Sequence, residues 1–253
     1  MRKLAIVLVA LLSPMAANAD LIYAPGGADT TEGDRDNCIP LSGCFAPDDG
    51  IDRSIDRYQQ VYDASLFSGF SGPMAISDIA FRLNFGSADA SGAYSDLRVN
   101  LSTTSASSTS YSLVFADNYG ADVTTVFDGA FSWTATSGGN PNAFDFLLTF
   151  DNPFVYDPLA GNLLFEWQNF GSDDTAAQFD AARFAPMSRI YAKGGGASAT
   201  NASGSTSRYG LVTRFTATAV PEPGTLALFG IGLFGVAFMR RRQTTKYRLS
   251  QVA

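Results

Sequence analysis

The stretch DIAFRLNF, residues 78–85, decides the fold class because polar and apolar side chains alternate along it with a period of two. In a β-strand this period places Ile79, Phe81, Leu83 and Phe85 on one face and the residues between them on the other. We therefore expect a strand whose first face is buried and whose second face, which carries Arg82, meets water.

The same alternation recurs along the chain between clusters of turn-forming residues. Apolar residues occupy alternate positions in six further segments, at 97–101, 111–115, 131–135, 144–150, 163–167 and 209–215. Turn-forming pairs such as Asn152-Pro153 separate these segments, and no ten-residue stretch of this part of the chain shows a helical period. The pattern predicts an all-β fold, an antiparallel β-sandwich of jelly-roll-like type.

Two parts of the same region lack the alternation. Residues 20–56 are rich in turn-forming residues, so we expect an irregular entry segment, with a short helix or turn at 52–58. Residues 194–207 consist largely of Gly, Ser, Ala and Thr, and this composition predicts a loop.

The first nineteen residues have the pattern of a secretory signal peptide. Arg2 and Lys3 precede an apolar run at 4–12, and Ala17-Asn18-Ala19 supplies small residues at the −3 and −1 positions of a cleavage site. We expect cleavage between Ala19 and Asp20. The apolar run is too short for a membrane anchor, which needs about 20 residues.

The end of the chain contains three segments in a fixed order. The prolines of Pro221-Glu222-Pro223-Gly224 exclude a helix and a central strand, so we expect extended backbone that a peptidase can bind. The uncharged run at 225–239 predicts a transmembrane helix of roughly 22 Å, shorter than the ~30 Å hydrocarbon core of a bilayer. Arg240-Arg241-Arg242 forms a basic stop, which places residues 243–253 in the cytoplasm.

These three segments resemble the PEP-CTERM sorting signal of Gram-negative bacteria, which is the substrate of a membrane peptidase called exosortase. The resemblance rests on Pro221-Glu222-Pro223, the apolar run at 226–238 and the arginines at 240–242, although the tail at 243–253 is longer than usual. It implies that export machinery and exosortase are partners, that the inner membrane holds the precursor transiently, and that the processed protein reaches the cell surface or an extracellular polysaccharide matrix.

The chain thus divides into a signal peptide (1–19), a body (20–219), a sorting signal (220–242) and a tail (243–253). Segments of the body at 57–62, 99–104 and 153–158 also resemble the domain found ahead of many such signals. That second resemblance implies a β-sandwich and transfers no activity.

The exported body is strongly acidic. It carries ten of the 17 basic residues and 23 of the 24 acidic ones, so its net charge is about −13, from 10 minus 23. Such a charge repels nucleic acid, which we exclude as a partner. It favours solubility outside the cell and attracts divalent cations.

The two cysteines, Cys38 and Cys44, lie close together in the entry segment. In an oxidising compartment this spacing predicts one disulfide that closes a small turn-rich loop. Metal binding is the alternative, and it would need further ligands in a chain that has no histidine.

The composition argues against most catalytic chemistry. Without histidine the chain cannot contain a Ser-His-Asp or Cys-His arrangement. Its glutamates are Glu32, Glu166 and Glu222, and its aspartates form no distinctive pair of the kind that a glycosidase needs. We therefore predict a protein that is not an enzyme and needs no cofactor, with a polysaccharide hydrolase that uses an Asp pair as the weakest alternative.

Calcium is the metal that best suits the available ligands. Asp117, Asn118 and Asp122 place three oxygen ligands around Gly120, and hard oxygen ligands are those that calcium prefers. The alternative is ordinary turn chemistry, because Asp, Asn and Gly also favour turns.

The leading functional hypothesis is a structural or adhesive role in an exopolysaccharide matrix or biofilm. The alternative is a lectin-like carbohydrate-binding module, with or without calcium as a cofactor. Four aromatic residues in predicted loops are candidates for stacking on a sugar, namely Tyr94, Tyr119, Tyr156 and Phe170.

Overall fold

The computed structural model describes residues 19–41, 55–171 and 177–220, together with Gly230 and Gly232. Every strand pair in it is antiparallel. Within those three long ranges the helical segments are two 3-10 turns, η1 (Ala64–Phe67) and η2 (Phe115–Asn118). The body is therefore all-β, as the alternation predicts.

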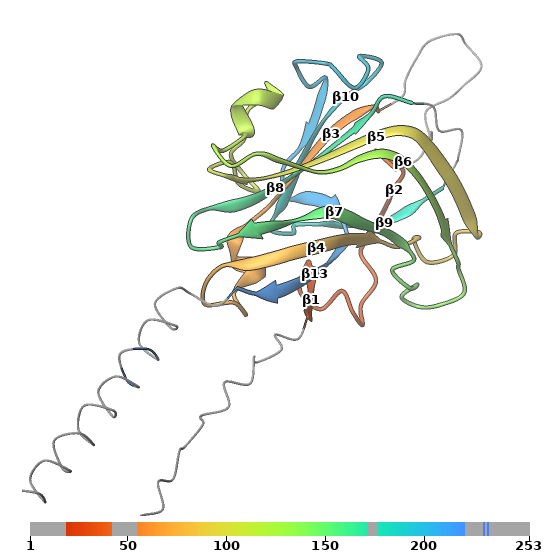
Figure 1. The fold of residues 1–253 in the computed structure, drawn as a ribbon. Coiled ribbons are helices and arrows are strands. Elements are labelled where there is room, and N and C mark those ends of the chain that lie inside the picture. Colours follow the sequence, from red (N-terminus) through yellow and green to blue (C-terminus); the bar gives the residue numbers. More distant parts are fainter. Residues whose placement is uncertain (1–18, 42–54, 172–176, 221–229, 231, 233–253) are drawn as a thin grey trace, which may run out of the picture.

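The strands form two main sheets that pack face to face, and Figure 1 shows them as two layers. The four-stranded sheet has the order β1 (Ala19–Ala24), β13 (Thr213–Ala219), β4 (Met74–Phe81) and β7 (Phe146–Tyr156). The six-stranded sheet has the order β11 (Gly204–Thr206), β10 (Met187–Ala192), β3 (Arg57–Tyr62), β8 (Asn162–Asn169), β5 (Ala90–Thr104) and β6 (Thr124–Ala135).

A third, three-stranded sheet has the order β12 (Tyr209–Leu211), β9 (Phe179–Arg183) and β2 (Arg35–Asn37).

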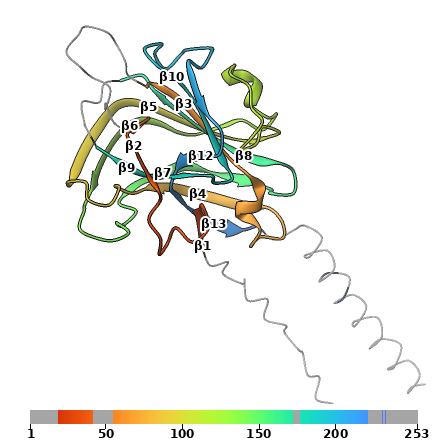
Figure 2. The same cartoon turned by 180° about the vertical axis from the view of Figure 1, so that it is seen from behind.

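The orders β1-β13-β4-β7 and β3-β8-β5-β6 are those of the two sheets of a jelly roll, with β10 and β11 added beside β3. The view from behind in Figure 2 shows the same layers.

The core lies between the two layers. Ile22, Phe215, Ile79 and Leu148 face one another across the four strands of the smaller sheet, and all four are buried. The rings of Phe81 and Phe165, from opposite layers, lie 5.9 Å apart, and those of Tyr62 and Phe215 lie 5.0 Å apart. Aromatic pairs of this kind add stability beyond the area that they bury.

The period-two pattern identifies most of the inner face correctly. Ile79, Phe81 and Leu83 are buried as expected, and so are the apolar positions at 97–101, 146–150 and 163–167. Phe85 is an exception: it is 55% exposed, because it lies in the turn that follows the bridge between Leu83 and Phe179.

The prediction of a strand at 111–115 is wrong. Residues 111–113 form no strand, Phe115 begins η2, and Leu113 is exposed. This segment lies instead over the outer face of the six-stranded sheet, where the Phe115 N–H donates to Thr200 O (3.1 Å). The alternation here reflects a loop that buries one aromatic ring, not a strand that pairs along its length.

The entry segment is more regular than its composition predicts. Residues 19–24 form β1, which pairs with β13. The helix or turn predicted at 52–58 is wrong for Arg57 and Tyr58, which belong to β3, and residues 52–54 lie outside the described residues. Asn152 and Pro153, which the sequence predicts to form a turn, belong to strand β7. Because β7 is at the sheet edge, Pro153 there need not donate to a neighbouring strand on both sides.

Candidate functional site

The two predicted processing points lie at the same end of the four-stranded sheet. Ala19 and Asp20 begin β1, opposite Thr218 and Ala217 of β13. β13 ends at Ala219, and the next residue, Val220, donates its N–H to Pro73 O (2.9 Å). The residues around the predicted signal-peptide cleavage point and the last residues before the sorting signal are therefore neighbours on paired strands.

The rest of the sorting signal lies outside the described residues. This applies to Pro221-Glu222-Pro223-Gly224, to Arg240-Arg241-Arg242 and to the tail at 243–253. Of the predicted membrane helix at 225–239 only Gly230 and Gly232 are described. Among the described residues, no helix has the length and apolar character needed to cross a membrane.

The predicted disulfide is only half within the described residues. Cys38 is buried just after β2, whereas Cys44 lies outside them. The pairing of Cys38 with Cys44 stays a prediction.

The candidate calcium ligands have protein partners. Asp122 Oδ1 accepts from the Thr103 N–H (2.8 Å), and Asp117 Oδ2 accepts from the Ser112 hydroxyl (2.9 Å). Asn118 is buried and donates its amide to Gln59 Oε1 (3.0 Å). These contacts fasten the loop to the six-stranded sheet, as turn chemistry does, and no group of three His, Cys, Asp or Glu that could hold a metal occurs in the described ranges.

Calcium binding at this loop stays a prediction with a direct test. An ion bound by Asp117, Asn118 and Asp122 is expected to raise the melting temperature by an amount that grows with calcium concentration. Asp122→Asn should remove that shift, measured in calcium against a chelator. An unchanged melting temperature of the unmodified protein would leave turn formation as the role of these residues.

The first buried polar cluster surrounds Glu166, on the outer face of the six-stranded sheet. Its carboxylate accepts from Arg57 Nη2 (2.8 Å), Gln59 Nε2 (3.1 Å) and Asn100 Nδ2 (2.8 Å), and also from the Tyr119 hydroxyl. Burial, reinforced by the nearby carboxylate, raises the pKa of Tyr119, so the hydroxyl keeps its proton as a donor. The alternation at 163–167 puts Glu166 on the face opposite the core, yet it is wholly buried because loops cover that face.

The second buried cluster joins Arg82 to Asp180. Arg82 Nε and Nη2 donate to Asp180 Oδ2 (2.8 and 2.6 Å), while Nη1 and Nη2 donate to the carbonyls of Ala28 (2.6 Å) and Thr31 (2.8 Å). Gly33 donates its N–H to Asp180 Oδ1 (2.9 Å). Arg82 was also expected to face water, but it is buried and holds the entry loop against the sheets.

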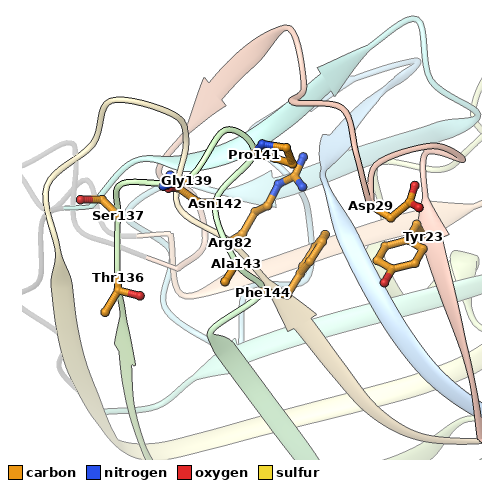
Figure 3. Close-up of a pocket in the computed structure, with 10 residues that line it drawn as sticks. All are labelled: Tyr23, Asp29, Arg82, Thr136, Ser137, Gly139, Pro141, Asn142, Ala143 and Phe144. Atoms are coloured by element: carbon orange, nitrogen blue, oxygen red, sulfur yellow. The ribbon is translucent and has the colours of Figure 1, made fainter.

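A surface pocket of about 400 Å³ opens beside this second cluster. In Figure 3, Tyr23 and Asp29 lie on one side, Thr136 and Ser137 on the other, and Arg82 and Phe144 between them. The pocket is built by β1, the entry loop, the end of β4 and the loop between β6 and β7. These segments lie far apart in the sequence, so no local motif predicts it.

The loop aromatics predicted to stack on sugars mostly do not face solvent. Tyr94 and Tyr156 are buried in strands of the core, and Tyr119 is half-buried against Glu166. Phe170 is exposed, with Arg98 5.3 Å from its ring centroid. The aromatic residues that line the pocket are Tyr23 and Phe144, neither of which was predicted as a ligand-binding residue.

Comparison with known proteins identifies the end of the chain. A family model described as the PEP-CTERM protein-sorting motif matches residues 219–242. No curated protein and no solved structure is significantly similar to the chain. The match begins at the last residue of β13, Ala219, and spans Pro221-Glu222-Pro223 and the three arginines. The chain therefore carries a PEP-CTERM protein-sorting motif directly after its all-β body, and exosortase is the sorting partner that this motif implies.

Proposed function

We propose that this protein is an exported surface or matrix protein whose acidic all-β body has a structural or adhesive role in an extracellular polysaccharide. The observation that carries the proposal is the position of the sorting motif, which follows the last strand of the body without an intervening linker. Processing there would release a compact domain, with its edge strand β1 formed from the first residues of the exported chain.

The state of the buried carboxylates supports a role without catalysis. Glu166 and Asp180 are buried, as the catalytic acid or base of an enzyme often is. Each carboxylate, however, accepts several hydrogen bonds from other residues of the body. Groups that stabilise the fold in this way are poor candidates for proton transfer to a substrate. A polysaccharide hydrolase is therefore the least supported of the three functional hypotheses. Release of soluble sugar from a polysaccharide by the purified protein would support it.

Carbohydrate binding is the second candidate function. It is favoured by the pocket beside Arg82, where the aromatic residues Tyr23 and Phe144 lie near polar side chains. A structural role and sugar binding are compatible, because a matrix protein can be retained by the polymer that it contacts.

The test of sorting is the intact mass of the protein from its native host, with sequencing of both ends. We expect a chain that starts at Asp20 and ends within residues 220–224, before the membrane helix and the arginines. As a matched control, replacing Pro221-Glu222-Pro223 by three alanines should leave the N-terminal cleavage unchanged and retain the arginine tail. A mature protein that still ends at Ala253 would contradict processing, and the body would then be a domain tethered to the inner membrane.

A further inference from the structure

We propose that the pocket between Tyr23, Asp29 and Phe144 binds one uncharged sugar residue of a polysaccharide. This inference rests on the proposed function, since it names the class of ligand that the matrix protein would hold. The pocket volume of about 400 Å³ falls within the range of roughly 300–1,000 Å³ that is typical of small-ligand sites.

The first argument is the aromatic surface. The rings of Tyr23 and Phe144 lie 5.7 Å apart at 51° and together form an angled apolar corner. The guanidinium groups of Arg82 and Arg214 lie 4.9 and 5.6 Å from the centroid of Phe144 and hold its ring in place. A rigid aromatic surface of this kind suits the C–H face of a sugar ring, which needs apolar contact on one side and hydrogen bonds at its edge.

The second argument is the set of polar groups without protein partners. Within the described part of the chain, neither the Tyr23 hydroxyl nor the exposed Asp29 carboxylate makes a side-chain hydrogen bond. A carboxylate accepts two hydrogen bonds side by side, which matches adjacent hydroxyls on a sugar.

Other polar groups of the pocket are held in place by the body. Asn142 donates its amide to Leu83 O and Asn84 O (3.1 Å each), and its Oδ1 accepts from the Gly139 N–H (3.0 Å). The Ser137 hydroxyl donates to Asp89 (2.9 Å), so its oxygen retains capacity to accept. Asn142 thus shapes the pocket wall, while the Ser137 oxygen and the Asp29 carboxylate are acceptors beside the apolar corner, an arrangement that favours a ligand rich in hydroxyl donors.

The third argument is charge, which selects a neutral sugar. The charged residues that line the pocket are Arg82, which is paired with Asp180, and Asp29; Arg214 contacts Phe144 but is not part of the lining. The acidic body, with its net charge of about −13, adds long-range repulsion toward uronic acids and other anionic polymers. A neutral hexose unit avoids that repulsion and keeps the Asp29 contacts.

The test is calorimetric titration of the protein purified from its native host. The probes are neutral gluco-, galacto- and manno-oligosaccharides, alginate oligosaccharides as the acidic comparison, and the extracellular polysaccharide of the same host. We expect at least one neutral probe to bind, and alginate oligosaccharides to bind more weakly. Asp29→Asn should weaken binding by about tenfold, since a hydrogen bond to a charged group is lost.

Two variants separate the pocket from the fold. Tyr23→Phe removes only the hydroxyl and should weaken binding several-fold with no change in melting temperature, while Tyr23→Ala should abolish binding by removing the stacking surface. Asp96→Asn and Phe184→Ala change an exposed carboxylate and an exposed ring outside the pocket, so they should leave affinity unchanged.

Each outcome decides the proposal. Binding that weakens in Asp29→Asn and Tyr23→Phe but not in the two controls supports it. Equal binding by all variants, no binding of any neutral probe, or a preference for alginate oligosaccharides overturns the pocket assignment. The proposed function fails separately, if the protein is retained in the inner membrane with an intact C-terminus or is absent from the matrix.

Discussion

Replacing Arg82 with methionine is expected to lower the free energy of unfolding by about 3–5 kcal/mol at pH 7, because the change leaves the buried Asp180 without its counterion. Methionine keeps the apolar part of the side chain but loses the bonds to Ala28 O and Thr31 O that hold the entry loop. Urea unfolding followed by the fluorescence of the two core tryptophans, Trp133 and Trp167, measures the loss.

The cost should depend on pH in a defined direction. Burial already raises the pKa of Asp180 to about 6, although Arg82 and the Gly33 N–H act in the opposite direction, and without Arg82 the pKa rises further. The unfolded carboxyl has a pKa near 3.9, so between about pH 4 and the folded-state pKa the folded variant binds more protons than the unfolded chain. Its stability is therefore greatest at low pH and falls as the pH rises through 6.

Two further variants check this explanation. Arg98→Met breaks an exposed pair with Asp128 (2.9 Å), and we expect it to cost less than about 1 kcal/mol. The double variant Arg82→Met with Asp180→Leu removes both charges, so it should be more stable at pH 7 than Arg82→Met alone and should lose the steep pH dependence. A double variant as unstable as the sum of the single ones would show that loop anchoring, not charge pairing, dominates.

The second large effect is expected at Glu166. Glu166→Gln keeps the size of the side chain but replaces one carboxylate oxygen with an amide donor, which must face Arg57, Gln59, Asn100 or Tyr119, all donors to Glu166. The variant also leaves Arg57 without its buried counterion. We expect a loss of about 3 kcal/mol in the free energy of unfolding, measured by urea unfolding.

Glu32→Gln is the matched control for this variant. Glu32 is only partly buried, and the hydrogen bond that it accepts from the Phe85 N–H (2.6 Å) can pass to the remaining carbonyl oxygen of glutamine. Its ion pair with Arg82, at 3.9 Å, is longer than the 2.8 Å pair between Glu166 and Arg57. A loss well below that of Glu166→Gln is expected. If both glutamine variants were equally stable, the network around Glu166 would contribute little, and its burial would need another explanation.

These two clusters also mark the limit of prediction from sequence. Alternation identifies Ile79, Phe81 and Leu83 as core residues because one local period decides which face of a strand they share. The same rule assigns Arg82 and Glu166 to water, and both are buried. Their partners lie far away in the chain: Asp180 is 98 positions from Arg82, and Gln59 is 107 positions from Glu166.

The pocket shows the same limit for the candidate site. Tyr23 belongs to the segment at 20–56 that the composition predicts to be irregular. Phe144 belongs to the alternating segment at 144–150, whose apolar residues are predicted to lie in the core. The pairing of β1 with β13, and the return of the β6–β7 loop beside the end of β4, bring them together. The loop aromatics that composition favours, Tyr94 and Tyr156, are instead packed in the core.

The sequence by itself determined the all-β class, the acidity of the exported body and the PEP-CTERM motif at 219–242. Each of these follows from hydropathy period, charge count or residue order, which are properties of the chain before it folds. Only the tertiary structure decided that Arg82 and Glu166 are buried, that Tyr23 meets Phe144, and that β1 begins beside the end of β13. The physical reason is that antiparallel pairing joins residues separated by up to 199 positions, as in the pair Ala19 and Thr218. The period of a strand carries no information about which strand will be its neighbour.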